Sequence, residues 1–239
     1  MYAEVCAVER LSPSLLRLDF SGGTLDEFEA PTATDAYIKA RFLPQGSPLT
    51  VPFEAEDVEA VDAEFHPRPR RYTVRRWDAE RRVLTIDFVT HGDVGYAGSW
   101  AQRTVVGDRL QFTGPGGSYR PDVDADWHLM VGDESALGAI GASLESLPSS
   151  ARALVFVVVD DADHEIELPS RADVDITWLH RVGAPAPEEL LRDAVAAAAF
   201  PEGRFDVFVH GEAGEVRCVR KHLIADRGVD PDGASISPY

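Results

Sequence analysis

The chain has 239 residues, of which 44% are hydrophobic and 27% charged, an ordinary composition for a folded protein of one large or two smaller domains. Its formal net charge of −18 argues against nucleic-acid binding, because affinity for a phosphate backbone comes mainly from clustered lysine and arginine. The two cysteines, Cys6 and Cys218, lie near opposite ends of the chain, which argues against a disulfide framework or a thiolate metal site.

The beginning of the sequence carries no sign of export. Met1–Cys6 lacks a basic region followed by an apolar core, so we expect no secretory signal. No apolar run is long enough for a membrane helix. We therefore expect a cytoplasmic protein without membrane insertion.

The first half of the chain alternates apolar and polar residues over short segments, a pattern typical of strands. In residues 83–89, Leu84, Ile86 and Phe88 share one face, while Thr85 and Asp87 lie on the other. Short strands separated by Gly and Pro predict a small antiparallel barrel, closed or nearly closed. The predicted strands are residues 4–9, 15–20, 36–42, 71–77, 83–89 and 109–113, and residues 44–69 are predicted to form a long surface loop.

The second half of the chain alternates predicted strands with predicted helices. Continuous apolar runs such as residues 154–159 are typical of a parallel sheet covered on both faces. We expect a barrel domain over residues 1–118 and a doubly wound α/β domain over residues 119–239, with the boundary in the Gly-, Pro- and Asp-rich segment 117–126. The predicted strands are residues 128–132, 154–159, 174–179 and 205–210, and the predicted helices are residues 135–147, 187–199 and 215–226.

The first candidate binding motif is the strand segment Arg70–Arg75. An arginine here can form a forked pair with a phosphate, and Tyr72 can lie against a flat ring. Thr73 can hydrogen-bond a diphosphate or the edge of a flavin. The alternative interpretation is a solvated barrel face.

The second candidate motif is the glycine-rich segment 88–101. Gly92, Gly95 and Gly98 allow the backbone to approach a ligand closely, and a short helix beginning near Ser99 would direct N–H groups at an anion. A diphosphate fits this arrangement. The alternative is a glycine-rich connector between strands in which His91 is a surface residue or a polar residue with satisfied hydrogen bonds.

The third candidate motif follows the first strand of the second domain. Ligands of open α/β sheets bind at the carboxyl ends of strands, where Gly132 would permit close approach and Ser135 would cap the following helix. The alternative is a simple strand-to-helix turn in which Asp133 or Ser135 is the cap.

Taken in order, these motifs resemble those of the siderophore-interacting protein family, ferric-siderophore reductases related to ferredoxin-NADP reductases. The resemblance covers nearly the whole chain. The matching segments are Asp35-Ala-Tyr37-Ile-Lys39, Arg-x-Tyr-Thr-Val-Arg at 70–75, His-Gly-Asp-x-Gly-x-Ala-x-x-Trp-Ala at 91–101, Gly-Pro-Gly-Gly-x-Tyr ending at Tyr119, Gly-Asp-Glu-Ser-Ala-Leu from Gly132, and Gly211-Glu212. The sequence departs from the family pattern at Tyr96, Gly98 and Gly138, where the family usually has Pro, Ser and Pro.

The resemblance implies a ferredoxin reductase-like enzyme whose barrel binds FAD, with Tyr72 stacking on the flavin, and whose α/β domain binds NADH or NADPH. Electrons would pass to the iron of a ferric siderophore, in a protein that we expect to be a monomer. The implied FAD-binding residues are Arg70, Tyr72, Thr73, Arg75, His91, Gly92, Asp93, Gly95, Ala97, Ser99 and Trp100, and the residues implied to frame the nicotinamide are Gly132, Asp133, Glu134 and Ser135.

Several points stay open at this level. Lys39, Arg41, Arg220 and Lys221 could attract an anionic ferric complex, or could simply be solvated. Arg181, which follows a strand of the second domain, could meet the 2′-phosphate of NADPH. We expect no protein metal ligands and no acid–base catalyst. The alternative functions are a general NAD(P)H:flavin or ferredoxin-type reductase and a siderophore-binding protein that has lost FAD.

Overall fold

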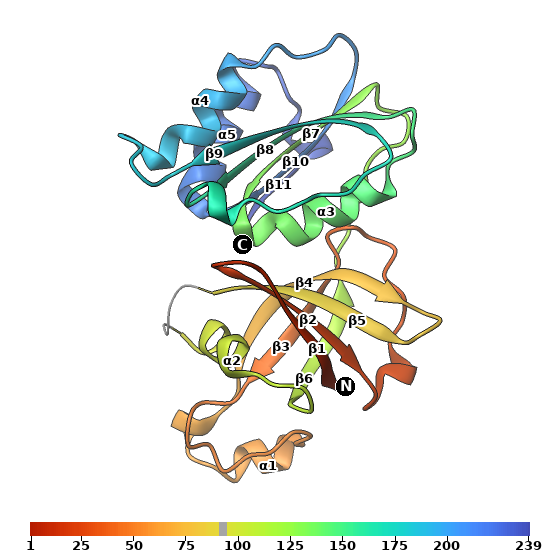
Figure 1. Cartoon of the computed structure of the whole chain (residues 1–239), viewed down its shortest axis with the longest axis vertical. Coiled ribbons are helices and arrows are strands. Elements are labelled where there is room, and N and C mark those ends of the chain that lie inside the picture. The colour runs from red at the N-terminus through yellow and green to blue at the C-terminus, as the bar shows by residue number, and fades with distance from the viewer. Residues whose placement is uncertain (91–94) are drawn as a thin grey trace. The chain divides into compact units, whose positions relative to one another are not determined.

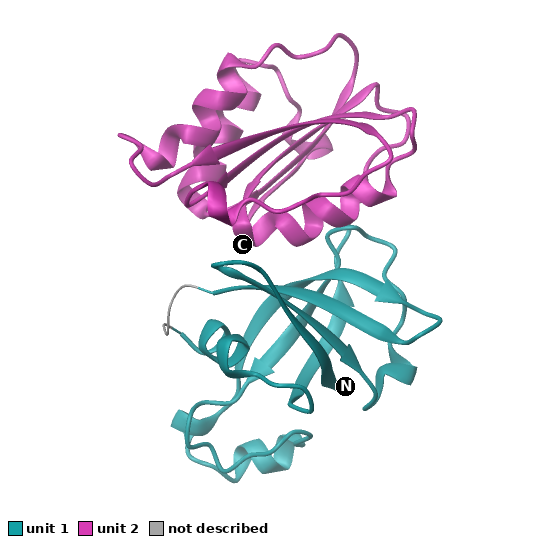
Figure 2. Ribbon diagram, viewed as in Figure 1, with its two compact units in different colours: residues 1–118 teal, residues 119–239 magenta. Residues whose placement is uncertain are grey.

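The structure, a computed structural model, describes residues 1–90 and 95–239. Its chain forms two compact units, Met1–Ser118 and Tyr119–Tyr239 (Figure 2), which are described separately. No helix within the described residues combines the length and apolar character needed to cross a membrane.

The first unit is a closed barrel of six antiparallel strands in the order β1-β2-β5-β4-β3-β6 (Figure 1). Pairing of β1 with β6 closes it. All six predicted strands are present, which confirms the predicted barrel. The strands are β1 (Tyr2–Ser12), β2 (Leu15–Ser21), β3 (Tyr37–Phe42), β4 (Arg68–Asp78), β5 (Val83–Val89) and β6 (Arg109–Gly116).

The wall of the barrel is buried on its outer side as well as its inner side at β2 and β5. Inside, Leu84, Ile86 and Phe88 are fully buried. Outside, Asp87 is only 4% exposed, and its two carboxylate oxygens accept 2.8 Å hydrogen bonds from Nε and Nη2 of Arg17. Arg75, 7% exposed, places its Nε 3.9 Å from the same carboxylate. One buried acid therefore faces two guanidinium groups from the neighbouring strands.

Two short helices complete the first unit. α1 (Ala55–Glu59) lies within the segment predicted to be a loop, and its N-terminus is held by a capping box between Glu54 and Asp57. None of its residues is buried, so no apolar periodicity marks it in the sequence. α2 (Ala97–Arg103) begins two residues before the predicted start at Ser99.

The second unit is a five-stranded parallel sheet in the order β11-β10-β7-β8-β9. α3 covers one face and α4 and α5 cover the other (Figure 1), which confirms the predicted doubly wound sheet. The strands are β7 (Trp127–Asp133), β8 (Arg152–Val159), β9 (Asp173–His180), β10 (Phe205–Gly211) and β11 (Ser235–Pro238), and the helices are α3 (Leu137–Ser146), α4 (Leu190–Ala197) and α5 (Ala213–Ala225).

The strand order creates a switch point between β7 and β10. From β7 the chain builds β8 and β9 on one side, and then returns to build β10 and β11 on the other. The loops that follow β7 and β10 therefore leave the sheet in opposite directions. In open α/β sheets this divergence opens a crevice at the carboxyl ends of the strands, where ligands bind.

The shared carboxylate in the barrel wall leads to a prediction about stability. We expect Asp87→Ala to lower the free energy of unfolding by about 3 kcal/mol, because it removes the acid that faces two largely buried guanidinium groups. The control Glu4→Ala removes the exposed partner of Arg109 and should cost less than about 1 kcal/mol. Chemical denaturation measures both values, and equal losses would contradict this account of the wall.

Candidate functional site

The candidate binding residues form two groups, one in each unit. In the barrel, Tyr72 from β4 and Trp100 from α2 contact the same two core rings, those of Phe42 and Phe88. The ring centroids of Tyr72 and Phe88 are 4.3 Å apart, and those of Trp100 and Phe42 are 5.5 Å apart. The structure thus brings together the two aromatic residues of separate sequence motifs.

Tyr72 offers an uncharged ring. Burial raises the pKa of its hydroxyl to about 12, and the nearby charge of Arg70 opposes this effect only partly. The phenol therefore keeps its proton at neutral pH. Phe42 and Phe88, which support the two rings, were not among the predicted site residues. Each is one of the alternate residues of its strand that face the core, and this pattern was the signal that could have found them.

The remaining predicted residues of β4 fall on both faces of the strand. Arg70 is exposed and donates from Nη1 to the carbonyl oxygen of Pro69 at 2.8 Å, and its pairing opposite Ala40 places it on the same face as Tyr72. Thr73, half-buried, lies on the other face. Arg75 sits at a register shift between Val74 and Arg76 and points at Asp87 in the wall.

The glycine-rich segment is described only in part. His91, Gly92 and Asp93 lie outside the described residues. Gly95 has a φ of +79°, a backbone conformation that favours glycine. No atom of the described residues lies within 4 Å of an added Cβ, so they leave space for a side chain at this position.

In the following helix, Ala97 and Ser99 are buried, and Ala97 belongs to the barrel core. Just before the segment, the buried hydroxyl of Thr90 has no hydrogen-bond partner in the part of the chain that the structure describes.

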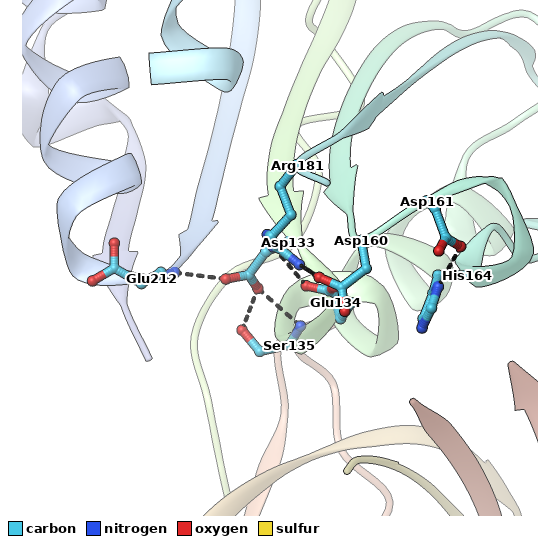
Figure 3. A network of polar contacts seen from close by, with 8 residues as sticks. All are labelled: Asp133, Glu134, Ser135, Asp160, Asp161, His164, Arg181 and Glu212. Carbon is cyan, nitrogen blue, oxygen red and sulfur yellow. Dashed lines mark hydrogen bonds and ion pairs between the residues drawn. The ribbon is translucent and has the colours of Figure 1, made fainter. Parts of the chain in front are cut away.

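In the second unit, one carboxylate joins the loops on either side of the switch point (Figure 3). Asp133, at the end of β7, accepts hydrogen bonds from the Ser135 N–H at 2.8 Å and from the Ser135 hydroxyl at 2.5 Å. Its other oxygen accepts from the Glu212 N–H, just after β10, at 2.8 Å. Asp133 is therefore the cap of the turn that leads into α3. The prediction that Ser135 caps this helix was wrong, because its hydroxyl donates to Asp133.

Two glycines make this junction possible. A Cβ on Gly211 would lie 2.9 Å from the carboxylate carbon of Asp133, and its φ of +148° also favours glycine. A Cβ on Gly132 would lie 2.5 Å from Cβ of Ala136 and 2.6 Å from the carbonyl oxygen of His210. The space over Gly132 is thus filled by the unit's own atoms, which explains this glycine by packing.

Arg181, which follows β9, is tied to carboxylates of two other loops (Figure 3). Its Nη2 donates to Glu134 Oε2 at 2.9 Å and its Nη1 donates to Asp160 Oδ1 at 2.8 Å and also to Glu134 Oε1. Burial lowers the pKa of Arg181, but the hydrogen bonds to Glu134 and Asp160 outweigh it and raise the pKa overall. The residue considered for a 2′-phosphate is engaged within the protein.

A further acid, Glu215, is buried in the first turn of α5. Burial raises its pKa to about 7; the charge of Asp133 adds to this rise and that of Arg181 opposes it. Its Oε2 has no hydrogen-bond partner among residues 1–90 and 95–239. Burial likewise raises the pKa of Asp133, against the effect of its hydrogen bonds.

The four basic residues considered for substrate binding lie in both units. Lys39 and Arg41 are on β3, where Lys39 pairs opposite Arg71, whose guanidinium lies 5.1 Å from the ring centroid of Tyr37. Arg220 and Lys221 are exposed on α5. Within β3 and β4 the barrel therefore carries a local group of cations on a strongly acidic protein.

Comparison with known families gives two matches that together span nearly the whole chain. Residues 4–119 match the siderophore-interacting FAD-binding domain, and residues 125–239 match the siderophore-interacting protein domain.

Relatives with known names match over most of their length. The chain is 35% identical to ferric vibriobactin reductase ViuB of Vibrio cholerae, over 96% of this chain and 84% of that protein. It is 30% identical to the NADPH-dependent ferric-chelate reductase of Escherichia coli, over 98% of this chain and 90% of the relative.

Solved structures agree. A siderophore utilization protein from T. fusca matches with a TM-score of 0.86 at 35% identity, over 100% of this chain and 91% of that one. Ferredoxin reductases share the two-unit fold at much lower identity, for example 10% with a TM-score of 0.70 for ferredoxin-NADP+ reductase from Plasmodium falciparum, a likeness that shows the fold alone.

The buried acid Glu215 leads to a prediction about pH. Because its folded-state pKa is raised from 4.5 to about 7, its stabilising effect is full below pH 4.5 and is lost as the pH rises through 7. The melting temperature of Glu215→Gln minus that of the original protein should therefore rise between pH 5 and pH 8, by at least about 2 °C. Glu202→Gln, at an exposed position, is the control and should show a constant difference. A difference for Glu215→Gln that stays constant or falls would contradict the burial of a protonated acid.

Proposed function

The chain belongs to the siderophore-interacting protein family, and from this membership we propose that it is an FAD-dependent reductase. It passes electrons from NADH or NADPH to the ferric iron of a siderophore. The observation that carries the proposal is that Tyr72 of β4 and Trp100 of α2 contact the same pair of core rings, in the unit that matches a FAD-binding domain. The strand that holds Tyr72 also presents Arg70.

The barrel residues fit a flavin dinucleotide. When bound, FAD accepts a hydride from a nicotinamide and gives up its electrons singly, as Fe(III) requires. Tyr72 supplies an uncharged ring for the flavin, and the exposed guanidinium of Arg70 supplies forked N–H donors for the diphosphate. The glycine-rich segment proposed to lie along the diphosphate is flanked by the hydroxyl of Thr90, which has no hydrogen-bond partner among the described residues, and by Gly95 with its positive φ.

The remaining residues predicted to bind FAD are proposed to act in this site either directly or by positioning its elements. Thr73 and Arg75 follow Tyr72 on β4. Arg75 acts indirectly, because its ion pair with Asp87 fixes the position of the strand. The helix α2 is held in position by the buried residues Ala97 and Ser99 and by the contacts of Trp100 with the core rings. The other proposed FAD contacts are His91, Gly92 and Asp93.

The second unit fits a nicotinamide donor that binds and leaves. Its switch point supplies the crevice, and Asp133 holds the two loops that border it. We assign Gly132, Glu134 and Ser135 to the same border. One hydride carries two electrons, so each NADH or NADPH consumed reduces two Fe(III) ions to Fe(II) and releases one proton.

The iron is substrate, held by the siderophore and not by protein ligands. Hard oxygen donors bind Fe(III) far better than Fe(II), so reduction loosens the metal without destroying the chelator. Lys39, Arg41, Arg220 and Lys221 attract the anionic ferric complex in this proposal. We place the reaction in the cytoplasm and the protein as a monomer.

The proposal predicts a yellow protein whose reduced flavin is reoxidised by ferric siderophores. In anaerobic stopped-flow experiments, we expect at least one ferric siderophore to accelerate reoxidation at least tenfold over buffer and more than free flavin or ferredoxin does. A response to free flavin or ferredoxin alone would point to a general reductase. A protein that stays colourless after reconstitution with FAD and still binds siderophores would point to a binding protein.

The stacking role of Tyr72 can be tested apart from turnover. We expect Tyr72→Ala to weaken FAD binding about tenfold, on the scale of ring-stacking energies of about 1 kcal/mol or more. Tyr72→Phe keeps the ring and should bind FAD within about twofold of the original protein. Fluorescence titration of the apoprotein measures both affinities, with melting temperatures as a check on folding. Equal affinity in all three proteins would show that the flavin lies elsewhere.

A further inference from the structure

We propose that the second unit selects NADH over NADPH, because Glu134 and Asp160 hold Arg181 in ion pairs and present carboxylates where the 2′-phosphate of NADPH would have to bind. This selection of NADH rests on the proposed function, since it presumes that a nicotinamide dinucleotide binds at this edge of the sheet. Glu134, Asp160 and Arg181 are the residues that determine which donor is used.

Asp160 directly follows the strand next to the central strand of the sheet. In doubly wound sheets the dinucleotide crosses the carboxyl edge at the switch point. An acidic residue beyond the strand next to the central one then hydrogen-bonds the ribose 2′-hydroxyl, whereas a nearby arginine accommodates a 2′-phosphate. Here β7 is central and β8 is its neighbour, and β8 is followed directly by Asp160 and Asp161, with side chains 42% and 50% exposed. The acids available to a 2′-hydroxyl are thus in place.

Arg181 is held by carboxylates of the protein itself. Both of its Nη atoms donate to carboxylate oxygens, in a fork to Glu134 and a further bond to Asp160 (Figure 3). Glu134 is only 6% exposed. Turning Arg181 toward a phosphate would leave a buried carboxylate without this partner, which is strongly unfavourable. The arginine is therefore committed to the protein.

The loops around Arg181 are strongly acidic. The end of β7 and the segments that follow β7, β8 and β10 bring carboxylates to the same edge of the sheet: Asp133, Glu134, Asp160, Asp161, Glu212 and Glu215. His164 pairs with Asp161 at 2.7 Å, and His180 pairs with Glu165 at 2.8 Å. A 2′-hydroxyl can donate to such carboxylates, whereas a 2′-phosphate adds negative charge among them.

The Escherichia coli relative carries NADPH dependence in its name, at 30% identity to this chain. Donor preference depends on a few side chains around one ribose hydroxyl, so relatives at this distance can differ in it. In this chain, the ion pairs of Arg181 favour NADH, the donor without the 2′-phosphate.

The test compares two fragments that differ only at the 2′ position, ADP-ribose and its 2′-phosphate, by calorimetry with the FAD-loaded protein. We expect ADP-ribose to bind at least tenfold more tightly. The rate constant for flavin reduction at low donor concentration should favour NADH over NADPH by a similar factor. In Asp160→Ser, which removes one carboxylate and frees one N–H of Arg181, both preferences should fall at least fivefold.

Asp173→Asn is the matched control. It removes one negative charge at the other end of β9, at an exposed position, and should leave both preferences within twofold of the original. Equal binding of the two fragments, or tighter binding of the phosphorylated one, would overturn donor selection while leaving the reductase function intact. Failure of both fragments to bind and of both donors to reduce the flavin would overturn the proposed function, and donor selection with it.

Discussion

β7 and β10 are neighbours in the sheet, but the chain continues from them to opposite sides. The loops that follow these two strands therefore diverge and need a link of their own. Asp133 provides it by capping the turn into α3 with one oxygen and accepting the Glu212 N–H with the other. Gly211 must then lack a side chain, because the carboxylate occupies that space. The border of the crevice, the start of α3 and the start of α5 all depend on this one buried group.

Charge is distributed unevenly over this acidic protein, and the uneven distribution matches the proposed ligands. Cations gather on β3 and β4, with Arg70 on the face of Tyr72 and Lys39, Arg41 and Arg71 on the opposite face. A diphosphate and an anionic iron complex are proposed to bind at this unit. Carboxylates gather at the edge of the sheet in the second unit, where the cation of Arg181 is neutralised by its own neighbours. Each unit thus favours a different kind of polar partner.

Much of the fold follows from local patterns in the sequence. Alternation in residues 83–89 and continuous apolar runs such as residues 154–159 determine the strands, and strand order then brings Gly132 and Gly211 to one place. α1 and β11 were not predicted, since the helix is held by polar caps and the strand is a short, half-exposed edge. The ion pairs of Arg181 depend on contacts between residues far apart in the chain, and no spacing rule reveals them.

The order in which the sheet is built has a consequence for synthesis of the chain on the ribosome. β7, β8 and β9 emerge first and can pair as a partial sheet, because each new strand adds beside the previous one. Asp133, however, gains its partner in the second loop only after Glu212 has been made. The crevice therefore takes shape only after β10 has been made, and a nascent chain can hold three strands of its sheet before it can hold a nucleotide.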